Sequence, residues 1–275
     1  MTRDFMKIAM QLGLIPGKTV EDKQKWASDS GLDGIEISAS DYLPDRLDQA
    51  RRDFEASPVP VSSICSNPSI DFLDPDPAKR RASIEESKLY LKLAAEFHAT
   101  GQIIPPIFGG PRLWEPFPPG GVVALEDDLL VETCKELGDF AGASGTLLLL
   151  EPLNRYEEHL LNTLARAVKI IERCGHPSVA LIPDFFHMHI EETSTPDALR
   201  HAGRHVRHVH LADNTRLEPG TGDINFVESF KVLNEIGFSG YLAFECIVVN
   251  PDRDTALRNS LDYIRDCLSK ARLTS

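Results

Sequence analysis

The sequence predicts a single (β/α)8 barrel of the TIM type, with residues 1–275 forming one domain. Three observations favour this fold class. Eight short apolar runs alternate with amphipathic segments from one end of the chain to the other. Several runs are continuously apolar, as in Leu147–Leu150, which is typical of parallel strands covered on both faces. A chain of 275 residues also has the usual size of such a barrel.

The predicted strands follow one another at intervals that leave room for a helix between them. In chain order they are 8–12, 34–38, 61–65, 102–107, 146–150, 179–183, 206–211 and 241–245. The run 206–211 is more polar than the others, because it carries two histidines and an arginine.

The predicted helices carry start and stop signals, which are clearest between residues 162 and 175. Asn162 or Thr163 can cap the helix by accepting a free backbone N–H. An apolar face then follows at helical spacing, made by Leu164, Ala167, Val168 and Ile171. Gly175 can adopt the left-handed conformation that ends a helix, and Pro177 prevents the helix from resuming. The segment 225–237 follows the same pattern.

The rival fold is a doubly wound open sheet, which would favour a glycine-rich phosphate loop after the first strand. The segment 11–17 lacks a GxGxxG motif, and the chain has no GxxxxGK[ST] motif. The Pro- and Gly-rich stretch 105–121 is too internal for a linker. It is interpreted as a long rim loop whose Trp114 and Phe117 shape the wall of a pocket.

Composition limits the possible partners. The formal net charge is −13, and an acidic surface repels phosphate backbones, so we expect no nucleic-acid partner. No apolar stretch approaches 18 residues, and the first residues lack a signal-peptide core, so we expect no membrane association. The five cysteines are an odd number without a CxxC pair, which predicts reduced thiols in a cytoplasmic protein.

Four polar residues lie at or near the ends of the last four predicted strands: Glu151, Asp184, His210 and Glu245. Residues at the carboxyl ends of barrel strands point into one mouth, so these side chains are expected to converge. An oxygen-rich set with one imidazole suits Mn²⁺, Mg²⁺ or Co²⁺. Taken singly, each carboxylate could instead cap a helix or pair with an arginine, and the histidine could be a satisfied core residue.

The sequence around these residues resembles the xylose isomerase-like TIM barrel superfamily of sugar isomerases and epimerases. The resemblance is strongest to its D-tagatose/D-psicose (ketose) 3-epimerase branch. The motifs that carry it are EPLNRYE at 151–157, HLLNT at 159–163, DFFHM at 184–188, HVHLAD at 208–213, PGTG at 219–222 and FE at 244–245. It is specific across 146–246. Over 1–145 it is general and rests on GLDGIE at 31–36.

The resemblance implies a ketose 3-epimerase that holds one divalent metal ion, with Mn²⁺ preferred and Mg²⁺ or Co²⁺ as alternatives. The implied ligands are Glu151, Asp184, His210 and Glu245. Glu151 and Glu245 would also be the catalytic acid and base, on opposite sides of the sugar, acting through a metal-stabilised enediolate.

The resemblance also implies that the sugar oxygens contact Glu157, His187 and Arg216. Alternatives are a solvated carboxylate for Glu157 and an ion pair with Asp213 or Glu218 for Arg216. Asp213 could also orient His210. A homo-oligomer, a dimer or a tetramer, is implied by the family alone.

Other functions remain open. An acidic residue followed by PGTG at 218–222 is nearer to hydroxypyruvate isomerases. A lyase or dehydratase on a keto-sugar or keto-acid would share the first proton abstraction. A repair endonuclease of the AP-endonuclease type is disfavoured by the acidic charge and by the absence of histidines before His98. A barrel that binds metal without catalysis is the fourth possibility.

Overall fold

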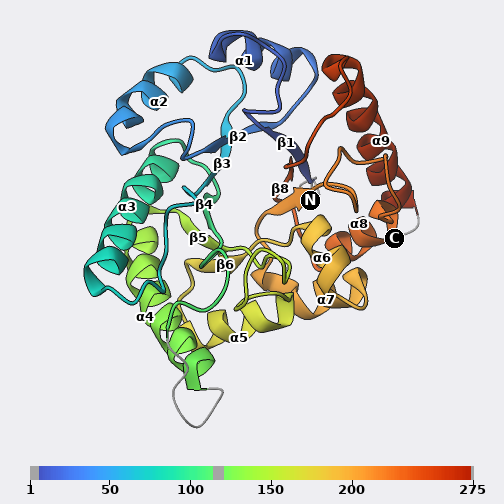
Figure 1. Ribbon diagram of the computed structural model, residues 1–275. Coiled ribbons are helices and arrows are strands. Elements are labelled where there is room, and N and C mark those ends of the chain that lie inside the picture. Colours follow the sequence, from blue (N-terminus) through green and yellow to red (C-terminus); the bar gives the residue numbers. More distant parts are fainter. Residues whose placement is uncertain (1–5, 114–120, 274–275) are drawn as a thin grey trace.

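The computed structural model describes residues 6–113 and 121–273, and its strands curl into a barrel surrounded by helices (Figure 1). The predicted (β/α)8 barrel is confirmed. The eight strands are β1 (Lys7–Gln11), β2 (Gly34–Ser38), β3 (Val61–Cys65), β4 (Gly101–Ile104), β5 (Leu147–Leu150), β6 (Val179–Leu181), β7 (Val209–Leu211) and β8 (Tyr241–Phe244). Trp114 and Phe117, predicted to shape a pocket wall, lie outside the described residues.

Helices follow the strands around the ring. The α-helices are α1 (Val20–Asp29), α2 (Leu47–Phe54), α3 (Pro77–Glu96), α4 (Gly121–Ser144), α5 (Leu164–Cys174), α6 (Phe185–Glu191), α7 (Thr195–Ala202), α8 (Phe226–Glu235) and α9 (Arg253–Leu273). Two short 3₁₀ turns, η1 (Pro44–Arg46) and η2 (Gly203–His205), precede α2 and β7. Within the described ranges, no helix has both the length and the hydrophobicity needed to cross a membrane.

The strands are parallel and follow the order β6-β5-β4-β3-β2-β1-β8-β7. The ring closes between β6 and β7 through two isolated parallel bridges, Leu181 with Val206 and Asp184 with His210. The N–H of His210 donates to the carbonyl of Pro183 at 2.9 Å across this seam. The closing seam therefore brings two of the predicted metal ligands side by side.

Five strands are shorter than predicted, and two of them, β5 and β8, differ by only one residue from the predicted runs 146–150 and 241–245. The run 102–107 leaves the sheet after Ile104, because Pro105 and Pro106 have no N–H to donate to a neighbouring strand. The run 179–183 ends at Leu181, and 206–211 pairs as a strand only over its last three residues. The residues beyond the strand ends form the rim that carries the polar side chains.

The predicted helix signals act as expected at α5 and α8. Thr163, rather than Asn162, caps α5 by accepting the N–H of Arg166 at 3.3 Å. Gly175 ends this helix at a φ of 66° in the left-handed region. At α8, the side chain of Asn225 accepts the N–H of Glu228 at 3.2 Å.

The barrel interior is divided into an apolar and a polar part. A small apolar cluster from β4, β5 and the β6 region consists of Ile103, Leu149, Ala180 and Ile182. The polar part of the interior consists of Glu36 on β2, Ser63 on β3 and His208 just before β7, which are fully buried and hydrogen-bonded to one another. The polar part lies directly beside His210.

Candidate metal centre and substrate cavity

The structure brings the four predicted metal ligands together around one imidazole nitrogen. His210 Nδ1 lies 2.8 Å from Glu151 Oε1, 2.9 Å from Glu245 Oε2 and 3.9 Å from Asp184 Oδ2. One ligand atom from each of the four residues lies within 4.8 Å of the others. The last four strand positions of the ring thus supply one imidazole and three carboxylates to a single point.

Asp184 is oriented by the helix that it starts. Its Oδ1 accepts the N–H groups of Phe186 at 2.7 Å and His187 at 3.3 Å, which caps α6. The other oxygen, Oδ2, is left to face His210. Capping therefore fixes the orientation of the carboxylate: Oδ1 stabilises the helix, and Oδ2 is available to the site.

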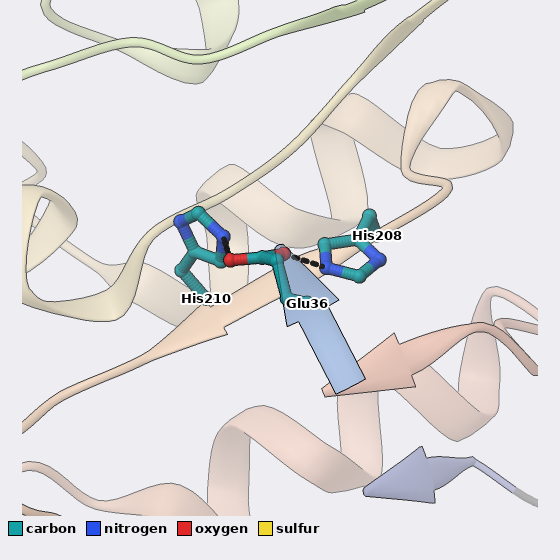
Figure 2. A group of neighbouring side chains, drawn as sticks. All are labelled: Glu36, His208 and His210. Carbon is teal, nitrogen blue, oxygen red and sulfur yellow. Dashed lines mark hydrogen bonds and ion pairs between the residues drawn. The ribbon is translucent and has the colours of Figure 1, made fainter. Parts of the chain in front are cut away.

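Glu36 on β2, the last residue of the motif GLDGIE, is a member of this centre that was not among the predicted site residues. Figure 2 shows its carboxylate between two imidazoles, 2.9 Å from Nε2 of His210 and 3.0 Å from Nε2 of His208. Its sequence signals are its place in that motif and its charge within an otherwise buried strand, which burial would exclude without a special partner. His208 is fully buried against it.

Gln11 at the end of β1 connects Glu36 to the predicted ligands. Its side-chain Nε2 donates to Glu36 Oε1 at 3.1 Å and to Glu245 Oε1 at 2.8 Å. Glu245 therefore has one oxygen held by an amide and the other turned toward His210. No feature of the sequence around Gln11 indicated this contact.

The electrostatics of the cluster favour a cation. Burial is the largest influence on His210 and lowers its pKa, but Glu245, Glu36 and Glu151 outweigh it, so the pKa lies well above its usual value. Burial, the main cause, raises the pKa of Glu151. For Glu245 burial is again the largest influence, yet His210 and Arg216 hold its pKa below the usual range.

This donor set fits a divalent ion. Three carboxylates crowd one imidazole, and such a concentration of negative charge in a buried place requires a positive partner. Carboxylate oxygens with a single imidazole are ligands suited to hard ions such as Mg²⁺ and Mn²⁺. Sulfur ligands of the kind used by structural zinc are absent from this group of four.

Arg216 lies against two of the predicted ligands. Its Nη1 donates to Asp184 Oδ2 at 2.5 Å, and its Nη2 donates to Glu245 Oε2 at 2.6 Å. The guanidinium carbon lies 4.9 Å from the centre of the Phe186 ring. The backbone of Arg216 has a φ of 62°, in a region that is uncommon for residues other than glycine. Such a conformation persists only where the surrounding structure holds it in place.

Asp213 is hydrogen-bonded to the backbone of its own loop. Its carboxylate accepts the backbone N–H groups of Asn214, Gly220 and Ile224. It thereby organises the loop between β7 and α8. Within the described residues, it forms neither the ion pair with Arg216 nor the contact with the His210 ring that the sequence left open as alternatives.

The side chain of His187 is held with a defined orientation. Its Nδ1 accepts the backbone N–H of Asn154 at 3.1 Å, so the proton of the neutral ring lies on Nε2. The side-chain amide of Asn154 also donates to Glu157 Oε1 at 2.8 Å. His187 Nε2 lies 3.9 Å from Asp184 Oδ2, beside the metal centre.

A cavity of about 240 Å³ opens over the centre. Its lining includes both predicted catalytic glutamates and all three predicted sugar-binding residues, together with Gln11: Glu151, Glu245, Glu157, His187, Arg216 and Gln11. Larger hollows occur at the opposite mouth of the barrel and beside α2, but neither contains the ligand group. The predicted catalytic and sugar-binding residues thus share one small pocket.

Comparison with known proteins places this geometry in a family. The model of the xylose isomerase-like TIM barrel family matches residues 24–267. A 3-dehydro-D-guloside 4-epimerase from Escherichia coli (strain K12) is 30% identical over 267 residues, which cover 95% of this chain and 100% of that protein.

Two further similarities bear on the site. A D-psicose 3-epimerase from Enterocloster bolteae is 37% identical over 119 residues, a match that covers 43% of this chain and 40% of that protein. The crystal structure of a 3-keto-D-glucoside 4-epimerase from E. coli superposes with a TM-score of 0.84 at 28% identity, covering 95% of this chain and 100% of that chain.

Proposed function

This chain belongs to the xylose isomerase-like TIM barrel family, and from that premise we propose that it is a metal-dependent epimerase of keto-sugars. The reaction would invert a carbon next to the ketone. The observation that carries the proposal is the convergence of three carboxylates on His210 Nδ1, at a cavity lined by Glu151 and Glu245.

A divalent ion, held by the four predicted ligands, would supply positive charge next to the sugar oxygens that become negative when the carbon–hydrogen bond breaks. Glu151, Asp184, His210 and Glu245 would hold it. The proposal rests on this donor set and on the relatives named above.

Inversion requires a proton to leave one face of the carbon and another to arrive on the opposite face. Glu151 follows β5 and Glu245 follows β8, with two strands between them in the ring, and both side chains line the cavity. Each is therefore in a position to serve one face, one carboxylate accepting the proton while the other donates.

The remaining lining residues would orient the sugar. The Nε2–H of His187 is a fixed donor, because Asn154 occupies the other ring nitrogen. The Arg216 guanidinium can neutralise charge that develops on a sugar oxygen. Glu157 can accept from a sugar hydroxyl, since one of its oxygens is already anchored by Asn154.

Two substrate classes share this chemistry and differ in where the ketone lies. A free 2-ketose would be inverted at C3, as the resemblance to ketose 3-epimerases favours. A 3-keto-glycoside would be inverted at C4, and the relative that matches over its full length, named a 3-dehydro-D-guloside 4-epimerase, favours this second class. The position next to the ketone is common to both.

The test is isotope exchange with a panel of keto-sugars. The protein is stripped with EDTA, reloaded with Mn²⁺, Mg²⁺ or Co²⁺, and incubated in D₂O with D-tagatose, D-psicose, a 3-keto-glucoside and hydroxypyruvate. We expect one deuterium at the inverted carbon, seen by NMR. Turnover that survives complete metal removal would contradict the metal dependence. Loss of water or formation of an aldehyde as the main product would instead favour the lyase or the isomerase.

We also propose Mn²⁺ as the working ion, a homo-oligomer as the assembly and the cytoplasm as the location. The first two rest on the family resemblance. The third rests on the five cysteines, all of which are free. Metal analysis of the purified protein and its mass in solution test the first two.

A further inference from the structure

We propose that Glu36 is a positioning residue that prepares two metal ligands, His210 directly and Glu245 through Gln11. The inference rests on the proposed metal dependence and concerns how this chain orients its metal ligands. It is carried by the contacts of Glu36 deep in the barrel.

The first step is that Glu36 is a buried charge with a complete set of donors. Its side chain is fully buried in the barrel interior. Its two oxygens receive contacts from five side chains, namely His208, His210, Ser63, Gln11 and Cys65. A carboxylate is costly to bury, and this arrangement compensates the cost without using the group for backbone capping or a surface ion pair.

The second step concerns which nitrogen of His210 is free. A carboxylate only accepts hydrogen bonds, so Nε2 of His210 carries a proton and donates it to Glu36 Oε1 at 2.9 Å. Once Nδ1 is deprotonated, as metal binding requires, its lone pair points to the place where the three other predicted ligands converge. Metal-bound histidines commonly donate their second ring N–H to a carboxylate, which fixes their orientation.

The third step is that Glu36 also orients Glu245, through the side chain of Gln11. The amide of Gln11 lies between two carboxylates, 3.1 Å from Glu36 Oε1 and 2.8 Å from Glu245 Oε1. Both contacts require the NH₂ group, so the amide has one orientation. With its Oε1 held in this way, Glu245 presents Oε2 to His210.

The fourth step is that the far side of Glu36 is anchored as well. Oε2 accepts from Ser63 Oγ at 2.6 Å and lies 3.0 Å from His208 Nε2. Figure 2 shows that the carboxylate is held between the two imidazoles. It therefore has little freedom to rotate away from His210.

A second metal ion at Glu36, His208 and His210 would be the competing interpretation, because their ligand atoms also lie close together. Two observations oppose it. Both oxygens of Glu36 already accept protons from Ser63 and Gln11. The Nε2 atom of His208 is likewise engaged, 3.0 Å from Glu36 Oε2 and 3.2 Å from Ser63 Oγ.

The experiment compares the Mn²⁺ affinity of folded variants, measured by the EPR signal of free Mn²⁺. Glu36→Gln removes the charge and offers His210 an amide that can donate as well as accept. We expect affinity to fall about 10- to 100-fold. Ser63→Ala is the matched control: it also removes a buried hydrogen bond to Glu36 but touches neither His210 nor Glu245, and its affinity should stay within about threefold of wild type.

The outcomes separate the two proposals. A Glu36→Gln protein that melts at a lower temperature but binds Mn²⁺ as tightly as wild type would reduce Glu36 to a structural role and overturn this inference alone. If wild type itself binds no Mn²⁺, the proposed function fails first. If Glu36→Gln does not fold, Gln11→Met on the cavity wall decides: unchanged Mn²⁺ affinity overturns the inference, and weakened affinity with unchanged apo stability supports it.

Discussion

Arg216 Nη2 donates a 2.6 Å hydrogen bond to Glu245 Oε2, the same oxygen that lies 2.9 Å from His210 Nδ1. Its Nη1 contacts the Asp184 oxygen that is not used in helix capping. The guanidinium therefore neutralises the two carboxylate oxygens that a divalent ion would use. An ion and Arg216 compete for the same negative charge.

This competition gives the first prediction. In Arg216→Met a positive charge next to the ion is lost, so Mn²⁺ should bind roughly threefold tighter or more. Turnover should nevertheless fall, on the order of 100-fold, because the guanidinium no longer neutralises charge that develops on a sugar oxygen. Equilibrium Mn²⁺ titration and steady-state kinetics measure the two effects. Arg216→Lys, which keeps the charge, is the control. Weaker Mn²⁺ binding by the methionine variant would show that Arg216 organises the ligands rather than competing with the ion.

The divided role of Asp184 gives the second prediction. Asn is as good a helix cap as Asp, so Asp184→Asn should keep α6 and the melting temperature of the metal-free protein. It loses the ligand charge. Wild type with Mn²⁺ at 100 times its dissociation constant should gain about 2.7 kcal/mol, or roughly 5 °C in melting temperature. The variant should gain almost none. Calorimetry with and without EDTA measures both, and an equal gain in the two proteins would remove Asp184 from the ligand set.

His187 gives the third prediction. His187→Ala should lower kcat/KM on the order of 10- to 100-fold, since a fixed donor beside the substrate is lost. Mn²⁺ affinity should change little, because the His187 ring is hydrogen-bonded to Asn154 and its Nε2 lies 3.9 Å from Asp184 Oδ2, beyond hydrogen-bond distance. His187→Gln, which restores an N–H donor, should recover part of the activity. A parallel loss of Mn²⁺ binding would instead assign His187 to the metal.

Glu158 gives a prediction about pH and stability. Its Oε1 accepts the N–H of Leu161 at 2.5 Å, while its buried Oε2 has no partner among the described residues. Burial, the largest influence, raises the pKa of Glu158 well above its usual value of 4.5. A raised pKa means that the unfolded chain releases this proton first. The contribution of Glu158 to the free energy of unfolding is therefore most favourable below about pH 4.5, and it is lost as the pH rises toward the pKa of this group in the folded protein.

Glu158→Gln keeps the acceptor for Leu161 and removes the ionisation. Its free energy of unfolding, from urea melts, should exceed that of wild type at pH 8 by about 1 kcal/mol or more, and the difference should shrink toward pH 5. Glu157→Gln, a neighbour whose carboxylate is partly exposed, serves as the control. A constant difference across this pH range would rule out the ionisation as its cause.

The sequence was sufficient for the fold and for the four converging residues, because both depend on local signals repeated at regular spacing. Glu151 and Glu245 end apolar runs that exclude charge, and a parallel barrel brings such ends to one rim. The cap and stop of α5 are equally local. These features follow from periodicity and from the chemistry of single residues.

Glu36 and Gln11 could not be found in this way. Glu36 lies within β2 rather than at its end, and it meets His210, 174 residues later, only after the ring has closed. Gln11 meets Glu245 across 234 residues. Arg216 contacts Asp184 and Glu245, which lie 32 and 29 residues away and which sequence proximity could not indicate.

The seam between β6 and β7 has a consequence for how the barrel is held shut. Seven of the eight neighbouring strand pairs form ladders, whereas β6 and β7 meet only through isolated bridges in the described chain. One of those bridges is Asp184 with His210. A bound ion would therefore hold β6 and β7 together at the place where the barrel closes without a strand ladder. The N–H groups of Arg207 and His210 donate across this seam, so their hydrogen exchange is expected to slow when the ion binds. Closure of the barrel would then depend on whether the metal site is filled.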